Sequence, residues 1–136
     1  MTEHFHINEF RSKDGEYFPK HAQENLKVLA EQLETLREHF GAPIKINSGY
    51  RSAKHNAKIG GEENSQHLLG KAADIVVEGI SPDEVADAID FLIDGKMMKQ
   101  GGLGRYATFT HYDIRGKKAR WDKRPKRQED SKEESE

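Results

Sequence analysis

The chain of 136 residues is long enough for one domain with a hydrophobic core, and too short for two. Its formal net charge of -2 gives no overall attraction to nucleic acid or to an anionic membrane, and its lack of cysteine excludes disulfides. No apolar stretch approaches the length required to span a bilayer.

The first half of the chain predicts a long helix, a short strand and a second, shorter helix. Apolar residues recur every three or four positions over residues 21–40, which indicates an amphipathic helix. Apolar and polar residues alternate over 44–47, which predicts a strand. Residues 52–59 can form a short helix with Ser52 as its N-cap, and an irregular, glycine-rich loop over 60–64 follows.

The second half predicts a buried strand, a helix and two further strands. Residues 72–77 are apolar apart from one carboxylate, as in a buried strand. Ser81-Pro82-Asp83-Glu84 is a capping box with proline at the first helical position, and it begins a helix that ends at Gly95. Residues 101–106 and 108–114 predict two strands joined by a tight turn. This order of elements favours an α+β domain on a mostly antiparallel sheet.

The C-terminal segment is strongly charged. Basic residues predominate over 115–127 and acidic residues over 129–136. Since no apolar periodicity follows Trp121, we expect one domain over 1–122 and a charged, disordered tail over 123–136. A basic run can also bind nucleic acid, but aromatic residues are almost absent beyond Trp121, so nucleic acid is not expected as a partner.

Three residues form the clearest candidate site. His67 lies seven residues before Asp74, and His111 follows after a long gap. A catalytic zinc takes three protein ligands and leaves a fourth position for water, whereas structural zinc sites are usually rich in cysteine. Asp74 lies within a predicted buried strand, where a bond to a metal would offset the cost of burying a carboxylate. The three together suggest a hydrolytic metal site, although each alone is compatible with an ordinary core or surface position.

The motifs Ser65-x-His67-x-x-Gly70-x-Ala72-x-Asp74 and His111-x-Asp113 resemble those of the zinc D-alanyl-D-alanine peptidases. This family includes D-alanyl-D-alanine carboxypeptidases and peptidoglycan endopeptidases, and it shares its fold with the hedgehog signalling domain. The similarity is greatest to a compact, short-chain branch of the family and extends from about Phe5 to Trp121. Further matching motifs lie in the segments 48–52, 101–106, 115–116 and 119–121. The resemblance implies a hedgehog/DD-peptidase-like α+β fold, with helices packed on a small sheet.

The same resemblance implies roles for individual residues. His67, Asp74 and His111 would bind one Zn²⁺ per chain. Arg51 would grip a carboxylate of the substrate, for which a planar guanidinium is suited; a surface ion pair is the alternative. Ser65 would either hydrogen-bond the substrate or simply start the turn before the first ligand.

The general base is less clearly marked. Many relatives carry an acid three residues before the second histidine, where this chain has Thr108. Asp113 is the candidate for the catalytic base, because it would share a strand face with His111. The alternative is that Asp113 orients His111 as its hydrogen-bond partner, as is common for metal-bound histidines.

The resemblance implies a hydrolase, a zinc metalloprotease that cleaves peptide bonds involving D-amino acids in peptidoglycan stem peptides during cell wall degradation. An endopeptidase is slightly favoured over a D,D-carboxypeptidase, because the short loops of a small chain leave the cleft open. The alternative is a non-catalytic module that retains zinc and binds the cell wall or another ligand, which the absence of an acid at Thr108 would favour.

The expected location follows from the substrate. The first residues contain no basic region followed by an apolar one, so no secretory signal and no membrane insertion are expected. Action on the cell wall would suit either a phage lysin or a trimmed exported bacterial protein. The oligomeric state is left open.

Overall fold

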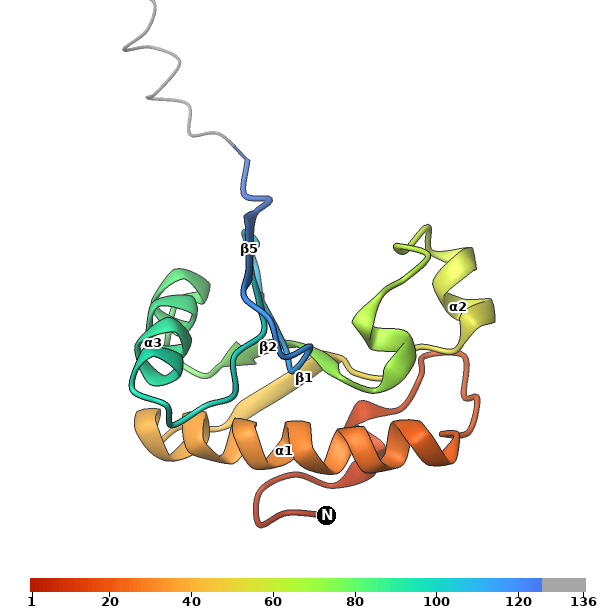
Figure 1. Cartoon of the computed structure of the whole chain (residues 1–136), viewed down its shortest axis with the longest axis horizontal. Coiled ribbons are helices and arrows are strands. Elements are labelled where there is room, and N and C mark those ends of the chain that lie inside the picture. Colours follow the sequence, from red (N-terminus) through yellow and green to blue (C-terminus); the bar gives the residue numbers. More distant parts are fainter. Residues whose placement is uncertain (126–136) are drawn as a thin grey trace, which may run out of the picture.

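The computed structural model of the chain describes residues 1–125 (Figure 1). In chain order the elements are η1 (Ile7–Phe10), α1 (Lys20–Phe40), β1 (Ile44–Ser48), α2 (Ala53–Lys58), η2 (Gln66–Leu69), β2 (Ala72–Val77), α3 (Pro82–Asp94), β3 (Gly102–Arg105), β4 (Thr110–Asp113) and β5 (Ala119–Asp122), where η denotes a 3₁₀ helix. The predicted α+β class is confirmed. The tail expected over 123–136 lies mostly outside the described residues, and the domain boundary at residue 122 stays a prediction.

A five-stranded sheet with the order β1-β2-β4-β3-β5 organises the domain. All neighbouring strands are antiparallel except β5, which is parallel to β3. Strands β3 and β4 are shorter than predicted, because residues 106–109 form the connection between them. The sequence prediction missed β5, whose four residues alternate in polarity but lie within the highly charged C-terminal segment.

The predicted helix boundaries coincide with capping residues. The Ser52 hydroxyl accepts a hydrogen bond from the backbone N–H of His55 (3.0 Å) at the start of α2. The Ser81 hydroxyl accepts one from the backbone N–H of Glu84 (3.2 Å) at the start of α3. Helix α1 ends at Gly41, whose φ of 61° is a left-handed conformation that glycine adopts without steric cost.

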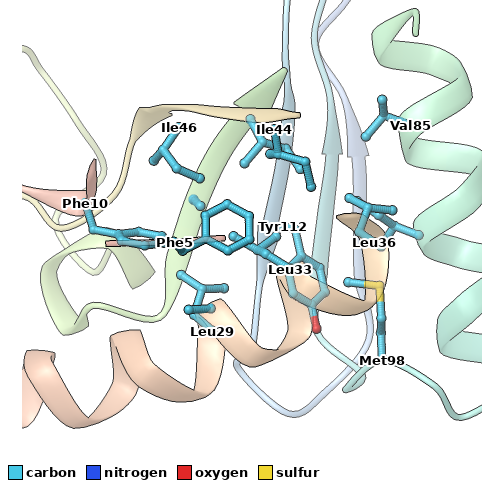
Figure 2. Packing of buried hydrophobic residues seen from close by; sticks show 14 of the residues in the cluster. Phe5, Phe10, Leu29, Leu33, Leu36, Ile44, Ile46, Val85, Met98 and Tyr112 are labelled. Carbon is cyan, nitrogen blue, oxygen red and sulfur yellow. The ribbon is translucent and has the colours of Figure 1, made fainter. Parts of the chain in front are cut away.

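The hydrophobic core lies between one face of the sheet and the helices α1 and α3 (Figures 1 and 2). Helix α1 contributes a fully buried stripe that includes Leu29, Leu33 and Leu36, and β4 contributes Tyr112, which has no exposed surface. Burying one such side chain stabilises the fold by about 1.5–3 kcal/mol. This packing fixes the sheet against α1 and thereby leaves its opposite face available for polar residues.

Strand alternation places the polar residues together on the other face of the sheet. Ile75 and Tyr112 belong to the core, while their chain neighbours Asp74 and His111 point to the opposite face. The strand register pairs Asp74 with His111 directly. Two of the three candidate ligands are therefore brought side by side by backbone pairing alone.

Candidate metal centre

A cleft of about 740 Å³ opens on the polar face of the sheet. One wall comes from the β3–β4 connection and β5, and the other comes from the loop between α2 and η2. The lining includes all three candidate ligands together with Arg51 and Ser65. The structure thus collects five of the six predicted site residues around one cavity.

His67, Asp74 and His111 converge in this cleft. One ligand atom from each can be chosen so that all three lie within 4.8 Å of one another. Asp74 Oδ1 lies 3.3 Å from His67 Nε2 and 3.0 Å from His111 Nδ1. All three side chains are buried. Two imidazoles and a carboxylate are a donor set that suits a catalytic zinc, so the residues present fit the implied cofactor.

Local turn chemistry delivers the first two ligands. Ser65 caps the N-terminus of η2, which carries His67. The helix ends at Gly70, whose φ of 71° lets the chain reverse into β2, where Asp74 lies. His67 and Asp74 are therefore set by the motif itself, whereas the third ligand arrives through the pairing of β4 with β2.

Each histidine is oriented by a hydrogen bond through the nitrogen that faces away from Asp74. His67 Nδ1 lies 2.6 Å from the carbonyl oxygen of Gly49, to which it can only donate, so its Nε2 is available to a metal. His111 Nε2 lies 2.7 Å from Asp113 Oδ2 and donates to that carboxylate, so its Nδ1 is available. Such partners fix the tautomer and ring orientation of metal-binding histidines.

Asp113 lies on the side of His111 opposite Asp74 and has no exposed side-chain surface. Its Oδ1 accepts hydrogen bonds from the backbone N–H of Gly102 and from Arg115, and its Oδ2 accepts from Arg115 and His111. It does not line the cleft. Asp113 does share a strand face with His111, but this position does not support the predicted role of catalytic base and favours the alternative, that it orients His111.

Hydrogen bonds outweigh burial in setting the charges of these groups. Burial works to raise the pKa of Asp74, but the contacts with His111 and His67 hold that pKa well below its usual value. Burial likewise works to raise the pKa of Asp113, but hydrogen bonds from His111 and Arg115 hold it below its usual value. Both carboxylates are therefore ionised at neutral pH, as a metal ligand and its partner need to be.

Arg51 and Ser65 line the cleft, and both also have partners within the protein. Arg51 Nη2 lies 3.5 Å from Asp74 Oδ2, and Nη1 donates to Asn56 Oδ1 (3.3 Å). These contacts hold the guanidinium beside the ligands rather than in a surface ion pair. The Ser65 hydroxyl accepts a hydrogen bond from the backbone N–H of His67 (3.1 Å), which agrees with the turn-starting role.

Arg115 and Trp121 are among the residues that line the cleft without having been predicted as site residues. Arg115 donates to Asp113, and the Trp121 ring packs against His111 with 5.0 Å between ring centroids. Both residues belong to segments that carried the family resemblance, which was the available signal. Neither an arginine after a strand nor a single tryptophan specifies a metal site, so the sequence predicted no metal-site role for Arg115 and only packing under the site for Trp121.

The chain is similar in part to known peptidases. The chain matches a zinc D-Ala-D-Ala carboxypeptidase of Streptomyces albus G with 40% identity over 55 residues, which is 40% of this chain and 22% of that protein. The crystal structure of a Serratia marcescens L-Ala D-Glu endopeptidase aligns with a TM-score of 0.38 and 20% identity over 65% of this chain and 72% of that chain. A model of the peptidase M15 family matches residues 3–113.

The family match includes all three candidate ligands and most of the described chain. The resemblance to zinc peptidases that the motifs predicted is thereby confirmed at the level of the family. This chain belongs to the peptidase M15 family, a family of zinc metallopeptidases.

Proposed function

We propose that this chain is a zinc-dependent peptidase that hydrolyses peptide bonds involving D-amino acids in bacterial peptidoglycan. The observation that supports it most is the convergence of His67, Asp74 and His111 in an open cleft, with both histidines held by hydrogen-bond partners. Zinc bound there would polarise a scissile carbonyl and lower the pKa of a water molecule to about 7.

The chain's own residues hold the metal and place the substrate. His67 Nε2, His111 Nδ1 and the Asp74 carboxylate are the ligand atoms, and Asp113 keeps the His111 ring in the orientation that presents Nδ1. Arg51, held beside Asp74, presents its guanidinium to the cleft and binds a carboxylate of the stem peptide through parallel hydrogen bonds.

Peptide hydrolysis also needs a group that takes a proton from water and passes it to the leaving amine. Thr108, where many relatives carry an acid, is exposed in the β3–β4 connection and does not line the cleft. Asp113 is buried behind His111 with both oxygens occupied. Within residues 1–125, the carboxylates that line the cleft besides Asp74 belong to Glu62 and Glu63, and we assign the proton transfer to this pair.

The short borders of the cleft support an endopeptidase. The β3–β4 connection that forms part of one wall consists of residues 106–109 only. A carboxypeptidase needs a closed end to recognise a free terminus, whereas short borders admit a longer peptide on both sides of the scissile bond. The proposed substrates are peptidoglycan stem peptides.

No helix of the described chain has the length and apolar character to cross a membrane.

A second candidate is a binding module that retains zinc without catalysing. The observation in its favour is the absence of an acid at Thr108. Both candidates predict zinc binding, so metal content alone does not separate them, and only the fate of a substrate does.

The test is mass spectrometry of purified muropeptides, cross-linked and uncross-linked, after incubation with zinc-loaded protein. A chelated sample and the His67→Ala variant are the controls. Zinc-dependent splitting of dimers or of the stem supports the endopeptidase and identifies its bond. Loss of a terminal alanine alone replaces it with a carboxypeptidase, and unchanged muropeptides with zinc bound support the binding module.

A further inference from the structure

We propose that Arg115 and Trp121 are positioning residues of the metal centre. With Asp113 they form a closed set of contacts around His111, which we call the His111 clamp (Asp113, Arg115 and Trp121). Both lie beyond residue 113, where the family match ends. The inference deepens the proposed function and rests on its assignment of His111 as a metal ligand.

Arg115 fixes the carboxylate that orients His111. Its Nε donates to Asp113 Oδ1 (2.9 Å) and its Nη2 donates to Oδ2 (2.7 Å), which is the bidentate geometry that only a guanidinium provides. The backbone N–H of Arg115 adds a third hydrogen bond to Oδ1 (3.1 Å). Because Oδ2 is also the acceptor for His111 Nε2, the plane of the carboxylate that Arg115 holds determines the direction of the imidazole ring.

Trp121 is the third member of the clamp and contacts the His111 ring directly. Its ring packs against the His111 ring at an angle of 48°, with 5.0 Å between centroids. The Arg115 guanidinium carbon lies 5.3 Å from the centroid of the Trp121 ring, a cation–π distance. The indole N–H donates to the Tyr106 hydroxyl (2.9 Å), which fixes the position of the ring. Trp121 therefore contacts both His111 and the arginine that orients it.

Strand β3 leaves room for the clamp through its glycines. A Cβ at Gly102 would overlap the Asp113 carboxylate, and a Cβ at Gly104 would overlap the indole nitrogen of Trp121. The register pairs Gly104 with His111 on one side and with Trp121 on the other. The side chains of Asp113 and Trp121 pass over these two positions and leave no room for a Cβ, which explains why both are glycine. This observation supports the clamp independently of the contacts between its own members.

The clamp predicts a property that ordinary packing does not. If Arg115 and Trp121 hold the His111 ring with Nδ1 toward Asp74, their loss should weaken metal binding and change the coordination geometry while the fold persists. Outer partners of metal ligands typically affect metal affinity by about 10–100-fold. A purely structural role would change stability and leave the affinity and geometry of the folded protein unaltered.

The experiment measures the zinc dissociation constant by competition with a chromophoric chelator, and the visible absorption spectrum of the Co²⁺ form. We expect Arg115→Ala and Trp121→Ala to raise the Kd about 10–100-fold and to change the cobalt spectrum. Trp121→Phe keeps a ring against His111 but loses the hydrogen bond to the Tyr106 hydroxyl, so its Kd should lie between those of the wild type and Trp121→Ala. The matched control is Arg105→Ala, because Arg105 is likewise paired with carboxylates, those of Asp83 and Asp87, but on the opposite face of the sheet.

Unchanged Kd values and cobalt spectra in folded Arg115→Ala and Trp121→Ala proteins would overturn the proposal. If far-UV circular dichroism shows that these variants do not fold, Arg115→Lys decides. Lysine keeps the charge but cannot form the fork, so weaker zinc binding supports the clamp and unchanged binding overturns it. None of these measurements needs a substrate, so a protein that fails to cleave muropeptides would refute the proposed peptidase activity without deciding this inference.

Discussion

Two arginine–carboxylate clusters lie on opposite faces of the same part of the sheet. On the cleft face, Arg115 pairs with Asp113, whose side chain has no exposed surface. On the face toward α3, Arg105 pairs with Asp83 and Asp87, whose side chains are 53% and 67% exposed. The chemical groups are the same in both clusters, and the difference between them is burial.

Burial decides what each cluster contributes. Exposed ion pairs typically contribute about 0–1 kcal/mol to stability, because water stabilises the separated charges almost as well as the charges stabilise each other when paired. Breaking a buried pair by removing one partner typically costs about 3–5 kcal/mol, because an uncompensated charge remains inside the protein. The α3-face cluster is therefore a dispensable surface contact, while the cleft-face cluster holds a metal ligand in one orientation.

Removing a ligand should produce the largest effect on the cleft face. We expect His67→Ala to lose bound zinc and all peptidase activity, because two remaining ligands do not complete the three-ligand set of a catalytic site. Zinc per chain, measured by elemental analysis, and muropeptide turnover test this. The control is His21→Ala, since His21 is an exposed histidine of α1. Full zinc occupancy in His67→Ala would refute the ligand assignment.

The second largest effect should come from neutralising the proposed proton acceptors, Glu62 and Glu63. We expect Glu62→Gln or Glu63→Gln to lower kcat by about 10²-fold or more with zinc content unchanged, since general base catalysis contributes about 10²–10⁴-fold. Glu31→Gln, at an exposed position on α1, is the matched control. If both cleft variants keep the wild-type kcat, the assignment of proton transfer to this pair is wrong.

The two clusters can be compared directly by their effects on stability. We expect Asp113→Ala to lower the free energy of unfolding of the metal-free protein by about 3 kcal/mol, the lower end of the range for a broken buried pair, because Arg115 is partly exposed. Asp87→Ala on the α3 face should lower it by about 1 kcal/mol or less. Urea denaturation measures both. Equal losses would contradict the contrast drawn between the two faces.

The smallest effect should come from an exposed carboxylate outside both clusters. Hydrogen bonds from Ser52 and Ser12 lower the pKa of Asp14 from its ordinary value of 3.8 to about 2. Because the pKa is lower in the folded state, the resulting stability is present above pH 3.8 and is lost as the pH falls toward 2. Ser52→Ala should raise the pKa of Asp14 toward 3.8, as measured by NMR titration.

The same substitution removes the N-cap of α2, which costs about 1 kcal/mol independently of pH. Comparing the variant with the wild type at neutral and acidic pH separates the two contributions. A pKa of Asp14 that stays near 2 in Ser52→Ala would show that the Ser52 hydroxyl is not its cause.

Local signals in the sequence were enough for the helices, most of the sheet and the ligand motif. The apolar spacing of α1, the caps at Ser52 and Ser81, and the buried pattern of β2 act over a few residues, so the sequence predicts them without a tertiary structure. The spacing of His67 and Asp74 is likewise local, because one turn at Gly70 connects η2 to β2. The α+β class followed from these patterns, and the zinc peptidase family was implied by the resemblance of the motifs to that family.

Only the tertiary structure decided what surrounds the ligands. The role of Asp113 depends on which nitrogen of His111 it meets, and strand alternation alone could not distinguish a base in the cleft from a partner behind the ring. Trp121 reaches His111 because β5 pairs in parallel with β3, and such long-range pairing has no signal in a charged segment of four residues. The sequence by itself determined which residues can bind the metal, and the register of the sheet determined which residues hold them in place.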